Sequence, residues 1–281
     1  MAIKDAMLVL RTYPTPTTDG FIASSVGLAE RLGCRISILA PEILIRLPST
    51  FLGNVLIDIP GMAACEMGKS AQNASVLVNL CSQLAEKRGI PHEMIKERAP
   101  IGEISLLIAE YGRLKDLIIL PALAGDFVDQ WDREAVIFNS ARPVVLMPEG
   151  RTLANAALKS VGVAWDYSRP AARAVADAMP ILERAETVHV VTVLNEKVFD
   201  ITRKTHEIGT YLARHNVNVE IHEIDAAGQH IGRVLEDFAN KLHLDLLVMG
   251  AYAHSRLREL VLGGATRSML AKPPVPLLLS H

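Results

Sequence analysis

The residues best suited to binding chemistry lie near the C-terminus, in two short stretches of small side chains. Met249-Gly250-Ala251 ends a continuous apolar run, and Gly263-Gly264-Ala265-Thr266 is expected to open the last helix. The first N–H groups of a helix have no partner within the helix, and they lie at the positive end of its dipole. Small side chains let phosphate oxygens approach such groups. The pattern therefore predicts an anion site that suits a phosphate.

Asp166 is the second candidate, because it directly follows a strand-like run from Val161 to Trp165. In a doubly wound sheet, ligands bind outside the carboxyl ends of the strands, so Asp166 and Gly250 are expected at one edge. The Asp166 carboxylate can accept hydrogen bonds from a ribose or an adenine there. Positive charge around a phosphate is available from four nearby side chains: His254, Arg256, Arg258 and Arg267.

Other familiar site patterns are incomplete. Ala63-x4-Gly68-Lys69-Ser70 resembles a phosphate loop, but it lacks the first glycine and does not follow a buried strand, so an ordinary helix start is expected. Neither His92-Glu93 nor His206-Glu207 has a second histidine four residues on, and no Cys/His cluster has zinc spacing. We therefore predict no metal site and no catalytic residues. An enzyme is not expected, beyond slow ATP hydrolysis.

An internal repeat indicates how these residues are positioned. Residues 116–122 and 245–251 are both apolar runs opened by an aspartate, as expected of strands buried on two faces. Each follows a helix-like segment and precedes a proline-led strand, 143–147 or 274–278. Earlier strands are expected in the same order in both halves, at 7–11, 36–40 and 92–96, and at 161–165, 188–194 and 217–224.

Strands that alternate with helices imply parallel sheets with right-handed crossovers. The predicted fold class is α/β, with two tandem doubly wound, Rossmann-like domains. Each is expected to be a five-stranded parallel sheet with helices on both faces. The turn residues from Pro148 to Thr152 place the boundary between domains 1–152 and 153–281.

The segment 249–266 resembles the nucleotide motif of the universal stress protein family, Gly-x2-Gly-x9-Gly-Ser/Thr. Gly250 and Gly263 match it at the family spacing, whereas Ala253 replaces the middle glycine and Gly264 the hydroxyl residue. The resemblance covers the whole chain as two copies. It implies an adenine nucleotide, such as ATP with Mg²⁺, in the cleft of the second domain. The implied binding residues are Asp166, Val193, Met249, Gly250, Ala253, His254, Gly263, Gly264, Ala265 and Thr266.

In the first half the same site looks dismantled. Thr12 stands where Asp166 does, Pro121 where Gly250 does, and Trp131 and Asp132 occupy the expected loop. We therefore expect no nucleotide in the first domain. The resemblance also implies that the fifth strands of the two halves pair, with 144–147 beside 275–279.

Charge and composition exclude several partners. The chain has 29 basic and 31 acidic residues, a net charge of −2, which gives no long-range attraction for nucleic acid or an anionic membrane. Three cysteines argue against a disulfide framework and favour buried free thiols. Without a signal peptide or membrane span, a cytoplasmic location is expected.

Two functions remain open: a regulatory nucleotide-binding protein, or a stress-response scaffold that acts through protein–protein contacts without nucleotide. The first half also carries an apolar segment, 41–68, that the second half lacks. It is expected either to pack as a loop on its own domain or to form a flap in a homodimer.

Overall fold

The computed structural model describes residues 2–47, 58–122, 127–148, 150, 158–194, 206–251 and 264–281, with the backbone alone at 127–132 and 264–265. The first half contains β1 (Asp5–Val9), α1 (Asp19–Leu32), β2 (Arg35–Leu39), β3 (Glu42–Leu44), α2 (Ile59–Lys87), β4 (His92–Ile95), β5 (Arg98–Pro100), the 3₁₀ helix η2 (Ile101–Glu103), α3 (Ile104–Gly112), β6 (Leu117–Ala122), α4 (Phe127–Ser140) and β7 (Val144–Pro148). The second half contains β8 (Ser160–Ala164), α5 (Arg169–Leu182), β9 (Thr187–Leu194), α6 (His206–Arg214), β10 (Val219–Asp225), α7 (Ile231–Lys241), β11 (Leu246–Gly250), α8 (Gly264–Ala271) and β12 (Leu277–Ser280).

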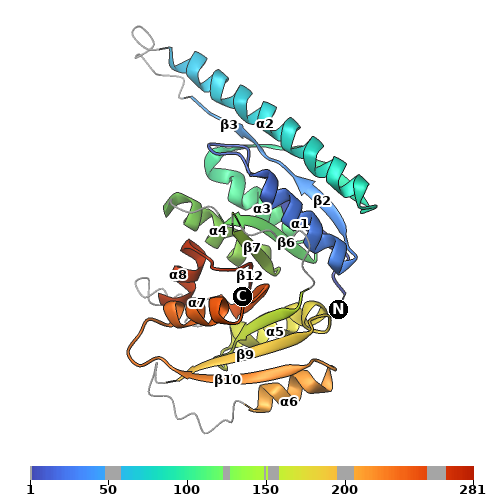
Figure 1. The fold of residues 1–281 in the computed structure, drawn as a ribbon. Coiled ribbons are helices and arrows are strands. Elements are labelled where there is room, and N and C mark those ends of the chain that lie inside the picture. Colours follow the sequence, from blue (N-terminus) through green and yellow to red (C-terminus); the bar gives the residue numbers. More distant parts are fainter. Residues whose placement is uncertain are drawn as a thin grey trace.

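The two halves form one continuous sheet with the strand order β10-β9-β8-β11-β12-β7-β6-β1-β2-β4 (Figure 1). Within each half, every pairing in this sheet is parallel. The order β4-β2-β1-β6-β7 in the first half corresponds to β10-β9-β8-β11-β12 in the second, so the predicted third, second, first, fourth and fifth strands lie side by side in both. The predicted α/β class and the doubly wound topology are therefore confirmed.

The halves meet through their fifth strands, as predicted. β12 pairs with β7 in the antiparallel sense, with Leu277 opposite Leu146 and Leu279 opposite Val144. An antiparallel pair of equivalent strands relates the halves by an approximate twofold rotation. The predicted boundary at 152/153 falls in 151–157, outside the described residues, and stays a proposal.

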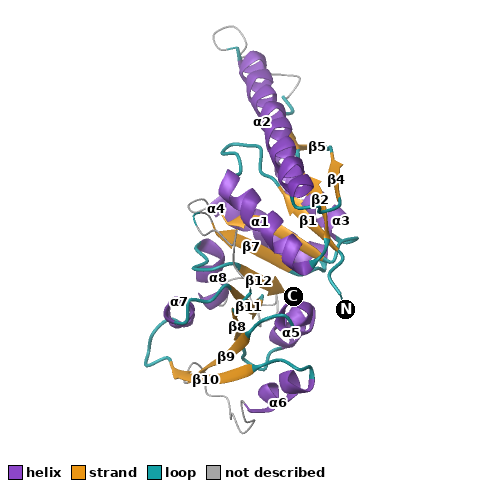
Figure 2. Cartoon of the chain, turned by 45° about the vertical axis from the view of Figure 1, so that its right-hand side comes forward, coloured by secondary structure: helices purple, strands orange, loops and turns teal. Residues whose placement is uncertain are grey.

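Helices cover both faces of the sheet (Figure 2). Buried side chains of α1, α2, α5 and α6 form one apolar cluster with the sheet. Those of α3, α4, α7 and α8 form another on the opposite face. The clusters are built mainly from Leu, Ile, Val and Ala, which suits helices packed on a parallel sheet. Among the described residues, no helix has the length and apolar character that crossing a membrane requires.

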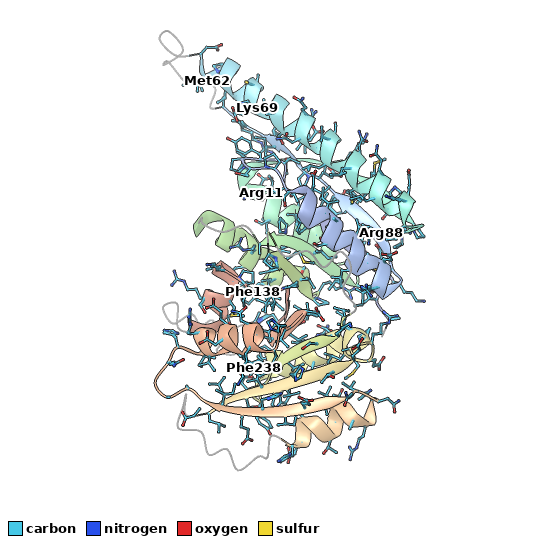
Figure 3. All side chains as sticks on the ribbon, in the orientation of Figure 1. Arg11, Met62, Lys69, Arg88, Phe138 and Phe238 are labelled. Carbon is cyan, nitrogen blue, oxygen red and sulfur yellow. The ribbon has the colours of Figure 1, made fainter. Side chains whose placement is uncertain are left out.

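The region after β2 differs from the expected loop. Residues 42–44 form β3, which pairs with β5 in a separate two-stranded sheet. Residues 48–57 are outside the described part, and from Ile59 onward the segment belongs to the 29-residue helix α2. Figure 3 labels Met62 near the start of α2 and Arg88 just beyond its end; the first turns of the helix extend past the rest of the domain.

The three cysteines are free, as predicted, but they are not all buried. Cys34 and Cys81 are buried, whereas Cys65 on α2 is exposed. Burial raises the pKa of the Cys34 thiol to about 11 and that of Cys81 to about 12, so both are protonated at neutral pH.

Candidate functional site

The candidate site is the carboxyl edge of the sheet in the second half. β8 lies between β9 and β11, and β12 lies on the other side of β11. All four strands are parallel, so the residues that follow β8, β9 and β11 reach the same edge. The sequence prediction that Asp166 and Gly250 share an edge follows directly from this topology.

Asp166 is exposed just beyond β8 and shapes the turn into α5. Its Oδ1 accepts a hydrogen bond from the backbone N–H of Ser168 at 3.0 Å, and the Ser168 hydroxyl in turn accepts one from the N–H of Ala171 at 3.2 Å. This is an aspartate turn followed by a helix N-cap. Between them, Tyr167 has a positive φ of 60°. One Asp166 oxygen is thereby committed to the turn, and the carboxylate is held at the sheet edge.

Gly250 ends β11 against the first turn of α5. A Cβ atom at this position would lie 2.4 Å from the backbone nitrogen of Ala171 and 2.5 Å from the carbonyl carbon of Pro170. Real Cβ atoms do not approach backbone atoms so closely, so any side chain here must displace the helix. The glycine is therefore required by packing, whatever binds nearby.

The last helix begins at Gly264, as predicted, so the small residues 264–266 form its first turn. Thr266 is buried, and Met249 belongs to the apolar cluster beneath α7 and α8. Val193 is partly buried near the end of β9 and packs against the same cluster. The remaining predicted residues, Ala253, His254 and Gly263, lie outside the described residues, as do Arg256 and Arg258.

Three buried polar atoms at this edge were not predicted. Trp165 Nε1, Thr192 Oγ1 and Ser280 Oγ have no hydrogen-bond partner within the part of the chain that the structure describes. They come from the ends of β8, β9 and β12. Strand alternation places all three on the face covered by α5, opposite Val193. A buried polar atom without a partner costs about 1 to 3 kcal/mol, so their concentration here marks the edge as unusual. Polar residues within the apolar runs 188–194 and 277–280 were the signal available in the sequence.

The corresponding edge of the first half is built differently. Thr12 Oγ1 donates to the carbonyl of Pro41 at 2.6 Å and lies 2.8 Å from Ser70 Oγ, which accepts from the N–H of Ile43 at 3.0 Å. Thr12 therefore connects β1 to β3 and α2. Because Ser70 lies inside α2, the phosphate-loop interpretation is excluded; the predicted helix is present, but it begins at Ile59, ahead of the expected start. Trp131 and Asp132 lie in α4, which corrects the expectation that they occupy a loop.

The first half nevertheless has a cavity of about 180 Å³ at its carboxyl edge. Its wall is largely aliphatic, from β1, β6, η2 and α3, and includes Pro121 and the buried Arg133. Arg11, labelled in Figure 3, lies at the same edge after β1. Among the described residues that line it, Arg11 and Arg133 are basic and none carries a carboxylate. The expectation that the first half binds no nucleotide therefore stays a prediction.

The fold and this edge first define a class of protein: a tandem of Rossmann-like α/β domains that share one sheet. The second unit can be assigned further, because residues 157–281 match the model of the universal stress protein family. No curated protein matches the sequence.

Solved structures resemble the entire chain. A universal stress protein from Archaeoglobus fulgidus DSM 4304 superposes with a TM-score of 0.72 at 18% identity, over 98% of this chain and 95% of that one. A putative universal stress protein from Pseudomonas aeruginosa UCBPP-PA14 gives 0.60 at 16%, over 99% and 93%. A protein of unknown function from Pseudomonas aeruginosa PAO1 gives 0.62 at 15%, over 99% and 92%. These likenesses establish the fold across both halves.

Proposed function

We propose that the protein is a regulatory universal stress protein that binds ATP or a related adenine nucleotide at the carboxyl edge of its second half. Mg²⁺ accompanies the phosphates in this proposal. The proposed role is regulatory rather than enzymatic, beyond slow ATP hydrolysis. Occupancy of the site would change how the protein meets its partners.

The observation that carries the proposal is the convergence of three elements on one edge. Asp166 follows β8, Gly250 ends the neighbouring β11, and the first turn of α8 starts at Gly264. The family motif supplies the reason to expect a nucleotide there. The buried polar atoms of Trp165, Thr192 and Ser280 add support, since a polar ligand could supply partners to such groups.

A scaffold without nucleotide is the second candidate, and one observation favours it. Gly250 is fully explained by its contact with Pro170 and Ala171, so its presence does not require a phosphate. Homodimer formation through the apolar segment 41–68 fits either function. Leu44 and Leu47, at one end of that segment, and Met62, in the first turn of α2, are exposed aliphatic side chains. The homodimer stays a prediction, and Leu52 and Ile57 lie outside the described residues.

Titration calorimetry with ATP, ADP and AMP tests the site directly. Asp166→Ala is expected to weaken binding about tenfold, because losing a hydrogen bond to a carboxylate costs about 1 to 3 kcal/mol. Asp177→Ala is the matched control, since Asp177 lies on α5 and pairs with Arg173 rather than facing the edge. Gly264→Asp should abolish binding, because it sets a carboxylate against the phosphates.

A restored motif separates the two candidates. The double variant Ala253→Gly with Gly264→Ser re-creates the family pattern and is expected to tighten nucleotide binding about tenfold. The serine supplies one hydrogen bond to the phosphates, and the glycine removes the strain of an alanine where the motif has a glycine. Absence of heat at millimolar nucleotide, in both the wild-type protein and this double variant, would refute the nucleotide proposal in favour of the scaffold.

A further inference from the structure

Two neighbouring strands of the second half bring two histidines and a glutamate together, away from the edge described above. His189 lies on β9, and Glu220 is its direct partner on β10; His222 lies two residues further along β10, on the same face. His189 Nδ1 lies 3.2 Å from His222 Nε2 and 3.3 Å from Glu220 Oε2. His222 Nε2 and Glu220 Oε2 are 3.8 Å apart.

These separations match the spacing of ligands around a zinc ion. Imidazole nitrogens bind Zn²⁺ at about 2.0 to 2.1 Å and carboxylate oxygens at about 2.0 to 2.2 Å, so neighbouring ligands of a tetrahedral ion lie about 3.3 to 3.4 Å apart. Two imidazoles with one carboxylate form a ligand set that suits zinc and leaves a fourth position open. We propose that His189, Glu220 and His222 bind a Zn²⁺ ion, with solvent in the fourth position.

The surroundings fix the ligands and leave a path for the ion. His189 is buried, and the ring of His222 meets the ring of Phe238 edge to face at 5.2 Å (Figure 3 labels Phe238). His222 also lines a groove of about 610 Å³ between β10 and α7, and the Glu220 side chain is 59% exposed. Two ligands are therefore held by packing, while the third can adjust to the ion.

Charged groups around His222 act on a cation as well as on the imidazole. Burial, followed by the neighbouring His189, lowers the pKa of His222, and Lys241 lowers it further, while Glu220 raises it. Lys241 is the opposing charge at this site, because its ammonium group repels a cation as well as a proton. Asp237 lies along the same groove and carries the opposite sign.

The proposed site departs from the expectation of no metal site, which considered only spacing along the chain. Glu220-x-His222 is a two-residue step on one strand, and His189 is 33 residues away from His222. Without a metal, the same geometry is an ordinary hydrogen bond between two imidazoles, one as donor and one as acceptor.

The experiment uses the full-length chain without a histidine tag, stripped with chelator and titrated with ZnCl₂ by calorimetry. Co²⁺ serves as a second probe, because four-coordinate Co²⁺ absorbs strongly in the visible. One ion per chain is expected. Glu220→Gln, His189→Gln and His222→Gln should each weaken Zn²⁺ binding by about tenfold or more, as loss of one of three ligands implies. His230→Gln is the matched control, because His230 is an exposed histidine at the start of α7.

Lys241→Gln gives a result that a purely structural histidine pair does not predict: Zn²⁺ should bind several-fold more tightly, since a repelling charge is removed. Zn²⁺ should also raise the melting temperature of the wild-type protein but not of Glu220→Gln, whose side chain is exposed enough to leave the fold intact. The proposal is overturned if the wild-type protein binds no stoichiometric Zn²⁺, or if it binds no more tightly than the Glu220→Gln variant.

Discussion

Gly250 shows how one residue can carry two explanations, and how a substitution separates them. The motif suggests that its missing side chain makes room for a phosphate. The structure shows that it makes room for the first turn of α5, with Ala171 N only 2.4 Å from where a Cβ would lie. Both explanations forbid a side chain, but only the second predicts a loss of stability in the absence of ligand.

We expect Gly250→Ala to lower the free energy of unfolding by about 1 to 3 kcal/mol, the usual cost of inserting a methyl group into a packed site. The measurement is urea denaturation without nucleotide. Gly20→Ala is the control, because a Cβ at Gly20 on α1 has no atom within 4 Å and an alanine there favours the helix. If the Gly250→Ala and Gly20→Ala variants were equally stable, α5 would move aside at little cost, and the packing explanation would fail.

The residues of the candidate site were only partly predictable. Asp166 and Gly250 could be found because each follows an apolar run, and a parallel sheet brings such positions together. The contact between Gly250 and Pro170 could not be found, because it depends on the angle at which α5 crosses β11. The buried polar atoms were missed for a related reason. Whether such an atom finds a partner among the described residues depends on the packed structure, and this holds for Trp165, Thr192 and Ser280.

At the scale of elements, the aspartates that open the repeated strands have a definite task. Asp116 Oδ2 accepts hydrogen bonds from the N–H groups of Lys4 at 2.8 Å and Asp5 at 3.1 Å, at the start of β1. Asp245 Oδ2 does the same for Lys159 at 2.7 Å and Ser160 at 3.0 Å, at the start of β8. The repeat thus preserves a carboxylate clamp that holds the first strand beside the fourth.

Removing the clamp should destabilise either half. Asp245→Ala is expected to cost about 1 to 3 kcal/mol, because two charge-assisted hydrogen bonds to backbone N–H groups are lost. Asp116→Ala should cost a similar amount. Asp177→Ala, which removes only a surface ion pair with Arg173, should cost under about 1 kcal/mol. The measurement is the melting temperature of the three variants. If Asp245→Ala and Asp116→Ala melted at the same temperature as Asp177→Ala, the clamp would contribute nothing to stability.

Most elements were predictable from the sequence, because a strand or helix expected in one half could be compared with its equivalent in the other half. The start of α2 was not, because the helix was expected to start in the stretch from Ala63 to Ser70, whereas it begins at Ile59. The structure places Pro60 in the first turn, where a missing N–H costs no helical bond, and Asp58 caps the helix by accepting from the N–H of Gly61 at 2.9 Å. The pair β3 and β5 was missed because three-residue strands carry too few residues to show a pattern.

At the scale of the molecule, the antiparallel junction of β7 and β12 turns two sheets into one. Each fifth strand would otherwise be an exposed apolar edge, open to pairing with another chain. Pro276 precedes β12 and donates nothing to the ladder, while its carbonyl accepts from the N–H of Leu247 at 2.9 Å. Pairing of the fifth strands leaves β4 and β10 as the outer strands of the sheet.

The junction also joins the hydrophobic cores. Val145 of β7 and Leu278 of β12 belong to one apolar cluster, together with buried residues of α1 and α5 from the two halves. Val144 and Leu279 belong to the cluster on the opposite face. Neither half can therefore unfold without exposing apolar surface of the other. Each Å² of apolar surface exposed costs about 25 cal/mol of stability, which disfavours a half-folded chain.

We accordingly predict that the chain unfolds in one cooperative transition, in which damage to the first half is felt by the second. The chain has two tryptophans, so Trp131→Phe leaves Trp165 as a fluorescent reporter in the second half. On that background, Leu8→Ala removes a fully buried side chain of β1 and should cost about 2 to 5 kcal/mol. The Trp165 midpoint in urea should fall together with the circular dichroism midpoint, whereas Leu114→Ala, at a side chain that is 86% exposed, should move neither.

The prediction is wrong if the Trp165 midpoint stays in place while the circular dichroism signal changes in two steps. The halves would then fold independently, and the shared sheet would only hold two separately folded units together.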